Sequence, residues 1–207
     1  MGGYRLTDGI FSSLREEISS TNMKLIESLK GNDKYFNTIE YIKVFFSDTM
    51  MEDVEFLNTF SGQSLFKVRH AQIIMRDLLE QVIEFIFLMK HPDLISEYVG
   101  ENIDIQSVEQ SSPVKGMKKL ASGRYSKGRK SVAEMARDVG ESKSKPGHPA
   151  LYELYCLLSE ECHNSYFFAR LDDYKEYINN QEILALSEDQ AENLGIIIRR
   201  FMEAYRT

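Results

Sequence analysis

The sequence predicts an all-α protein, a helical bundle of about five to seven helices with an irregular basic insertion. Apolar residues recur with helical spacing in at least five segments, no convincing stretch alternates as a strand would, and only four of the 207 residues are proline. A single domain over residues 1–207 is expected, long enough to bury roughly 70% of its unfolded surface. The composition, 43% apolar and 28% charged, excludes a mainly disordered, collagen-like or disulfide-scaffold protein.

Two helices are expected in the first third of the chain. The first spans about residues 8–30, where an apolar stripe precedes the stop signal Gly31. The second follows the candidate cap Asp33 and continues to Gly62. It is either one long helix or two helices that break near residues 47–48.

A third helix and a short fourth one are expected around the first proline. The third helix runs from about residue 64 to residue 89 and ends before Pro92, because proline disfavours helix at the residue before it. Pro92 itself suits the first position of a short helix.

Residues 101–148 form the predicted irregular insertion, rich in Ser, Gly, Lys and Gln. Within it, Ser131 and Glu134 form a capping box ahead of a short helix that Gly140 closes. After Pro149 a long helix resumes, with an apolar face made of Leu151, Leu154, Tyr155, Leu158 and Cys162. A second capping box, Ser187 with Gln190, precedes the closing helix.

Cysteine spacing and the absence of membrane signals favour a cytoplasmic protein. Cys156 and Cys162 are six residues apart on one predicted helix, so their Cα atoms lie about 9 Å apart, too far for a disulfide. The N-terminus carries no apolar leader segment. The most apolar stretch, residues 71–89, contains four charged residues, so no membrane-spanning helix is expected.

Charge is distributed unevenly along the chain. Residues 113–145 contain ten basic and three acidic residues, a local balance of +7 in a chain of net charge −7, so the remainder carries −14. Spaced cations on a Gly- and Ser-rich backbone can neutralise phosphates, which predicts RNA or DNA binding. The alternative is a solvated loop that folds back on the acidic bundle. The predicted nucleic-acid-binding residues are Lys118, Lys119, Arg124, Lys127, Arg129 and Lys130.

Two polar stripes run along otherwise apolar helices. Arg76 and Glu80 share one face of the third helix, and Ser159 and His163 share one shoulder of the fifth. If the two helices pack side by side, the four side chains converge and supply the groups for acid/base catalysis or anion binding. The alternative is an amphipathic helix whose histidine is satisfied by a neighbouring hydrogen bond.

Familiar catalytic and metal motifs are absent from the sequence. It contains no phosphate-binding loop, no H-E-x-x-H, no C-x-x-C and no G-x-S-x-G. Glu160-x-x-His163 matches half of a di-iron motif, and no other histidine supplies the second half. The sequence therefore predicts no cofactor and no metal site.

The segments from Arg76 to Glu80 and from Tyr155 to His163 resemble a bacterial helical family of unknown function, which has an R-x-x-x-E helix and a Y-x-x-x-S-x-x-x-H helix. That family resembles, more distantly, the HEPN helical bundles, many of which are dimeric ribonucleases of toxin–antitoxin and phage-defence systems. The resemblance covers about residues 65–170. Active HEPN ribonucleases carry an arginine four to six residues before a histidine, and no histidine here has one.

The resemblance implies a nucleic-acid-associated or defence-associated HEPN-like protein that forms a homodimer, with ribonuclease activity in doubt because the motif is missing. Two other readings stay open. One is a non-enzymatic protein-interaction module whose bundle presents the basic insertion. The other is a metal-dependent hydrolase that uses His163 and glutamates. The sequence is compatible both with an enzyme and with a non-enzymatic protein.

Overall fold

The structure, a computed structural model, confirms the all-α class. Its described part contains seven α-helices, one short 3-10 helix and no strand beyond a single isolated bridge. The helices are α1 (Asp8–Leu29), α2 (Ile39–Thr59), α3 (Leu65–Lys90), η2 (Pro92–Leu94), α4 (Ile95–Tyr98), α7 (Val132–Val139), α8 (Leu151–Cys162) and α11 (Glu188–Tyr205). The described residues are 8–32, 38–59, 65–98, 112, 130–162 and 188–207.

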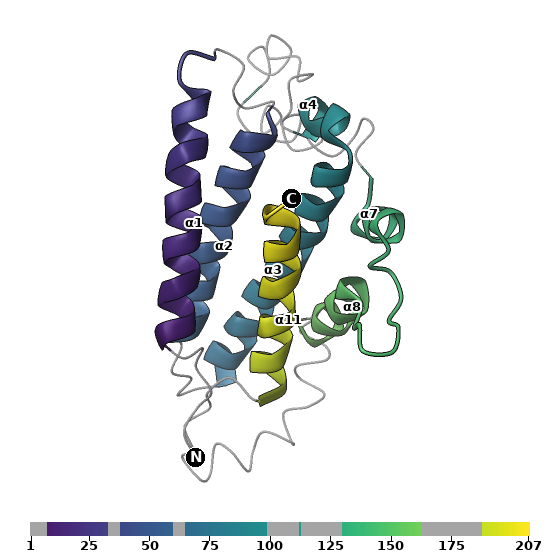
Figure 1. Cartoon of the computed structure of the whole chain (residues 1–207). Helices are drawn as coiled ribbons and strands as arrows, with labels where there is room; N and C mark the ends of the chain where they lie inside the picture. The colour runs from purple at the N-terminus through teal and green to yellow at the C-terminus, as the bar shows by residue number, and fades with distance from the viewer. Residues whose placement is uncertain (1–7, 33–37, 60–64, 99–111, 113–129, 163–187) are drawn as a thin grey trace.

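The central element is α3, which packs against α2, α7, α8 and α11, while α1 packs on α2 (Figure 1). Phe85 lies fully buried at the middle of this arrangement. Its ring centroid is 5.5 Å from that of Phe46 on α2 and 4.6 Å from that of Phe201 on α11. Aromatic contacts of this kind join the consecutive helices α2 and α3 to the C-terminal helix α11.

The predicted ends of several helices are confirmed. α1 ends two residues before Gly31, whose φ of 81° is the left-handed conformation that glycine adopts easily. α3 ends before Pro92, which starts η2. The capping box of α7 is present: the Ser131 hydroxyl accepts from the Glu134 amide, and the Glu134 carboxylate accepts from the Ser131 amide.

The start of α2 differs from the prediction. The helix begins at Ile39, because Thr38 supplies the cap: its hydroxyl accepts from the amide of Tyr41 at 3.2 Å. The predicted cap Asp33 lies outside the described residues, as does Ser187 before α11. The helix does not break near residues 47–48: α2 continues to Thr59, and the buried Ser47 hydroxyl donates to the carbonyl of Val44 within it.

Part of the predicted basic insertion is ordered by the bundle. Residues 130–148 form α7 and a turn in which Lys145 and His148 exchange two backbone hydrogen bonds. Met135 and Ala136 of α7 are buried against the core. Apart from residue 112, the rest of the insertion lies outside the described residues. Among the helices that the structure describes, none combines the length and hydropathy that a membrane crossing requires.

Candidate functional site

Arg76 of α3 and two hydroxyl groups of α8 form a polar contact across the helix interface. Arg76 Nε donates to Ser159 Oγ at 3.0 Å, and Arg76 Nη2 donates to the Tyr155 hydroxyl at 2.9 Å. The guanidinium also lies over the Tyr155 ring, 5.1 Å from its centroid. One arginine is therefore fixed by two hydrogen bonds and a ring face.

Sequence spacing explains why these groups meet. Tyr155 and Ser159 are four residues apart, so they lie one above the other on the same face of α8. Arg76 and Glu80 have the same spacing on α3, and the two helices pack directly against each other. The two helices that carry the polar stripes therefore pack side by side, and His163 of the second stripe lies outside the described residues.

Glu80 completes the charge pattern around Arg76. Its carboxylate lies 3.8 Å from Arg76 Nη2, an ion pair that is too long for a hydrogen bond. Burial opposes the charge of Arg76, but the hydrogen bond to Tyr155 and the nearby charge of Glu80 outweigh it. The pKa of Arg76 therefore lies above its ordinary value, and the guanidinium stays charged.

The two hydroxyl groups keep a chemical capacity that Arg76 does not use. Each accepts a hydrogen bond from Arg76, and a hydroxyl that accepts can still donate its own proton. Two of the five guanidinium N–H groups take part in these contacts. Arginine and hydroxyl donors at one point are suited to bind an anion such as a phosphate.

Of the four predicted catalytic residues, the structure brings together Arg76, Glu80 and Ser159. His163 lies outside the described residues, so its position opposite Arg76 or Glu80 stays a prediction. Tyr155 is the functional candidate that the site prediction missed. The helical pattern placed it on the apolar face of α8, although its spacing of four from Ser159 was a signal that both hydroxyls reach the same partner.

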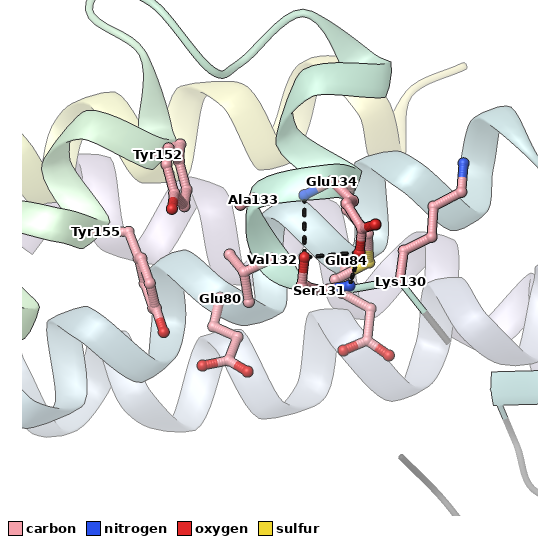
Figure 2. Close-up of a pocket in the computed structure, with 10 residues that line it drawn as sticks. Glu80, Glu84, Lys130, Ser131, Val132, Ala133, Glu134, Tyr152 and Tyr155 are labelled. Carbon is pink, nitrogen blue, oxygen red and sulfur yellow. Dashed lines mark hydrogen bonds between the residues drawn. The ribbon is translucent and has the colours of Figure 1, made fainter. Parts of the chain in front are cut away.

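An open pocket of about 580 Å³ adjoins this contact, between α3, α7 and α8. Glu80 and Glu84 come from α3, and Tyr152 and Tyr155 come from α8. Figure 2 shows the two tyrosine rings on one side and Ser131 with Lys130 on the other. The remaining lining residues are Val132, Ala133, Glu134 and Met135, all from α7.

The tyrosines form an aromatic wall. The ring centroids of Tyr152 and Tyr155 are 5.9 Å apart, and the ring planes differ by 19°. A hydrogen bond with Cys156 and partial burial raise the pKa of Tyr152 above its ordinary value, so the phenol stays protonated at neutral pH. Neither ring was among the predicted catalytic residues, although helical spacing places Tyr152 on the same polar shoulder as Ser159.

Lys130, one of the six predicted nucleic-acid-binding residues, lies in a cluster of cations at the other rim. Its ammonium group donates to Asp138 Oδ2 at 2.9 Å and lies 4.7 Å from the Phe87 ring centroid. Lys90 and His91 contact the other oxygen of Asp138, at 3.2 and 2.7 Å. These hydrogen bonds hold the pKa of the Asp138 carboxyl far below its usual range.

The remaining predicted nucleic-acid-binding residues, Lys118, Lys119, Arg124, Lys127 and Arg129, lie outside the described residues. The Asp138 cluster contains two lysines, Lys90 and Lys130, around one carboxylate, so its net charge is positive even when His91 is neutral. Lys130 therefore has a structural role, since its ion pair with Asp138 ties the chain before α7 to the C-terminal turn of that helix.

The described residues hold no group of three His, Cys, Asp or Glu side chains that could bind a metal ion. Cys156 and Cys162, both described, form no disulfide. No protein-family model matches the chain, and no curated protein or solved structure matches it either. Its function is therefore argued from the geometry of the site.

Proposed function

We propose that this chain is a HEPN-like helical protein that associates with RNA or DNA and does not cleave it by HEPN chemistry. The observation that supports this most is the contact of Arg76 with Tyr155 and Ser159 at the edge of an aromatic pocket. A fixed guanidinium with adjacent hydroxyl donors is suited to hold a phosphate, and tyrosine faces are suited to stack on bases.

The charge distribution supports the same class of ligand. Most of the molecule is acidic and would repel a nucleic acid, so binding would be limited to the basic segment, residues 113–145, and its surroundings. Lys130 is a described cation of this segment, and Lys90 of α3 adds another beside it at Asp138. A strand held by the segment would pass the pocket that Lys130 lines.

The absence of HEPN-type cleavage follows from the sequence. No histidine has an arginine four to six residues before it, so the pair of side chains that the HEPN ribonucleases use is missing. We place this function in the cytoplasm of a bacterium, in keeping with the resemblance and with two cysteines that form no disulfide.

The experiment is a fluorescence anisotropy titration with a labelled single-stranded RNA of mixed sequence at several salt concentrations. Log affinity should fall linearly with log salt, with a slope of about −0.7 for each phosphate neutralised.

Replacing Arg124, Lys127 and Arg129 together by Glu should abolish binding. Lys130 is kept, because its contact with Asp138 supports the fold. Arg76→Gln should weaken binding, and the RNA should stay intact.

The matched control reverses two cations on α1 and one directly after it, Arg15→Glu, Lys24→Glu and Lys30→Glu, far in sequence from the basic segment. The control has the same net charge change, so it separates local contact from overall charge. If both triple variants weaken binding equally, or if the original protein binds no RNA or single-stranded DNA, the proposal is wrong.

The second candidate function is a non-enzymatic interaction module that assembles with a second copy of the chain. It is favoured by the exposed apolar side chains of α1, where Met23 is 65% and Ile26 47% exposed. Both line a groove of about 360 Å³ between α1 and α2, with Met51 beside them. Light scattering should then report a dimer, and Met23→Lys with Ile26→Lys should convert it to a monomer.

A further inference from the structure

The pocket beside Arg76 differs chemically from a simple phosphate site. Its lining combines two tyrosine rings with the carboxylates of Glu80, Glu84 and Glu134, against a single cation, Lys130. This balance repels a phosphate from the interior. It favours a ligand part that is flat, uncharged and rich in N–H donors, because carboxylates are hydrogen-bond acceptors only.

We propose that this pocket is a subsite for a guanine base, whose phosphate lies outside it at Arg76. This inference rests on the proposed function and names the base that the site would select. The volume of about 580 Å³ is within the range of roughly 300–1,000 Å³ that is common for small-molecule sites.

Glu80 is the residue that distinguishes the bases. Guanine presents two neighbouring donors on one edge, N1–H and the N2 amino group, which match the two oxygens of one carboxylate. Adenine and cytosine place an acceptor nitrogen beside their amino group, and uracil flanks its single N–H with two carbonyls. Facing a carboxylate, each of these three bases would bring an acceptor against an acceptor.

Arg76 supports the contact between the Glu80 carboxylate and a base, and it does not occupy that carboxylate with a hydrogen bond of its own. At 3.8 Å it stabilises the negative charge of Glu80 by an ion pair that is longer than a hydrogen bond. The side chain of Glu80 is 35% exposed, and Figure 2 shows its carboxylate on the same side of the pocket as the Tyr155 hydroxyl. The carboxylate therefore reaches a base that stacks on the tyrosine wall.

The order of groups along α3 fits the shape of a nucleotide. Arg76, Glu80 and Glu84 follow one another at intervals of one helical turn, about 6 Å. The Arg76 and Glu80 side chains converge to 3.8 Å, so a phosphate would bind Arg76 on the side away from Glu80, and the ribose would span the distance to a base at the Glu80 carboxylate. Tyr155 contacts both parts, since its hydroxyl binds Arg76 and its ring lines the pocket.

The test measures binding of GMP, AMP, CMP and UMP to the full-length protein by isothermal titration calorimetry. GMP should bind at least about tenfold more tightly than the others, within the discrimination of a two-point contact between a carboxylate and a base. Glu80→Gln should remove this preference, because an amide presents one donor and one acceptor. Tyr152→Leu should weaken all four nucleotides, because it removes a stacking face.

Glu160→Gln is the matched control, a glutamate on α8 that does not line the pocket, and it should leave GMP binding unchanged. Circular dichroism of each variant checks that the helices are retained. A parallel titration with short RNAs that contain or lack guanine separates a base within a strand from a free nucleotide. Preference for guanine in either form supports the subsite.

The outcomes also separate this inference from the proposed function. If RNA binds with the expected salt dependence but without guanine preference, the guanine subsite is wrong and nucleic-acid association stands. If Glu80→Gln and Glu160→Gln behave alike while GMP is preferred, the base is bound elsewhere and the subsite is also wrong. If neither nucleotides nor RNA bind, both proposals fail.

Discussion

Asn22 lies buried at the meeting point of α1, α2 and α11. Its amide group donates to Ser47 Oγ at 2.9 Å and to Asp48 Oδ1 at 2.8 Å, and its carbonyl oxygen accepts from the Tyr205 hydroxyl at 2.7 Å. Burying an asparagine side chain destabilises the fold unless its polar atoms form hydrogen bonds. In Asn22, both the amide group and the carbonyl oxygen form them. The residue therefore fixes how three helices meet.

Asn22→Leu should lower the free energy of unfolding by about 2 kcal/mol, because it keeps the branching of the side chain but removes partners of buried polar groups. Urea denaturation followed by circular dichroism measures the change. Ser28→Ala, at an exposed position on the same helix, should change it by less than about 0.5 kcal/mol. Equal losses in the two variants would show that the network contributes nothing specific.

Asp138 gives the molecule a pH-dependent contribution to stability. Its folded pKa is depressed by hydrogen bonds from His91, Lys130 and Lys90, so the folded state favours the charged carboxylate. The contribution is fully present above the ordinary carboxyl pKa, about 3.9. It is lost as the pH falls through the lower folded value.

Asp138→Asn should therefore lower the melting temperature at pH 7, and the difference from the original protein should shrink between pH 4 and pH 2. Thermal unfolding at pH 7, 4 and 2 checks this. Asp93→Asn, on η2, is the control and should show no such convergence. A difference that is constant over this range would mean that the cluster does not depend on the carboxylate charge.

At the scale of elements, helix ends were predictable where a local signal determines them. Ser131, Glu134 and Gly140 act within one short segment, so the boundaries of α7 follow from neighbouring residues alone. The start of α2 was missed because Asp33 and Thr38 are both good caps, and sequence alone does not rank them. The helical periodicity of the sequence also did not predict which helices pack together.

The capping box predicts how α7 responds to substitution. Ser131→Ala should lower the free energy of unfolding by about 1 kcal/mol, since it leaves amide groups of the first turn without their acceptor. Ser131→Thr should keep most of the stability, because threonine retains a hydroxyl that caps the helix and can donate to the Glu134 carboxylate. Denaturation of both variants measures the difference, and equal loss in the two would contradict a capping role.

Gly140 should be equally sensitive for a different reason. Its φ of 85° lies in the left-handed region, where no neighbouring atom obstructs a Cβ but the backbone itself is strained for other residues. Gly140→Ala should therefore cost about 1 kcal/mol of unfolding free energy. Gly195→Ala, within α11, is the comparison and should be neutral or stabilising in the same denaturation assay.

At the scale of the whole molecule, the candidate site was predictable in part. The stripes on α3 and α8 followed from helical spacing, and their contact required only that these two helices pack together. Tyr155 was missed because a tyrosine on an apolar helix face can either pack in the core with its ring or bind a partner with its hydroxyl. Only the tertiary structure shows that its hydroxyl is bonded to Arg76. The pocket needs α7 as a third wall, which no local pattern predicts.

The C-terminal helix α11 is also held in place by residues that are distant from it in the sequence. The Glu141 carboxylate, only 9% exposed, accepts from the Leu151 amide at 3.2 Å and pairs with Arg200 Nε of α11 at 3.5 Å. His148 lies between them: Arg200 contacts its Nδ1, so its Nε2 carries the proton that Glu141 accepts at 3.1 Å. This network joins α11 to the connection between α7 and α8.

Arg200→Met should lower the free energy of unfolding by about 3 kcal/mol, because it leaves the Glu141 charge buried without its cation. The double variant Glu141→Gln, Arg200→Met should recover part of this loss, since the unpaired charge is then gone. Arg199→Met, at an exposed position on the same helix, should change stability by less than about 0.5 kcal/mol. Urea denaturation of the original protein, Glu141→Gln, Arg200→Met and the double variant forms a double-mutant cycle, and additive losses would show that Glu141 and Arg200 do not interact.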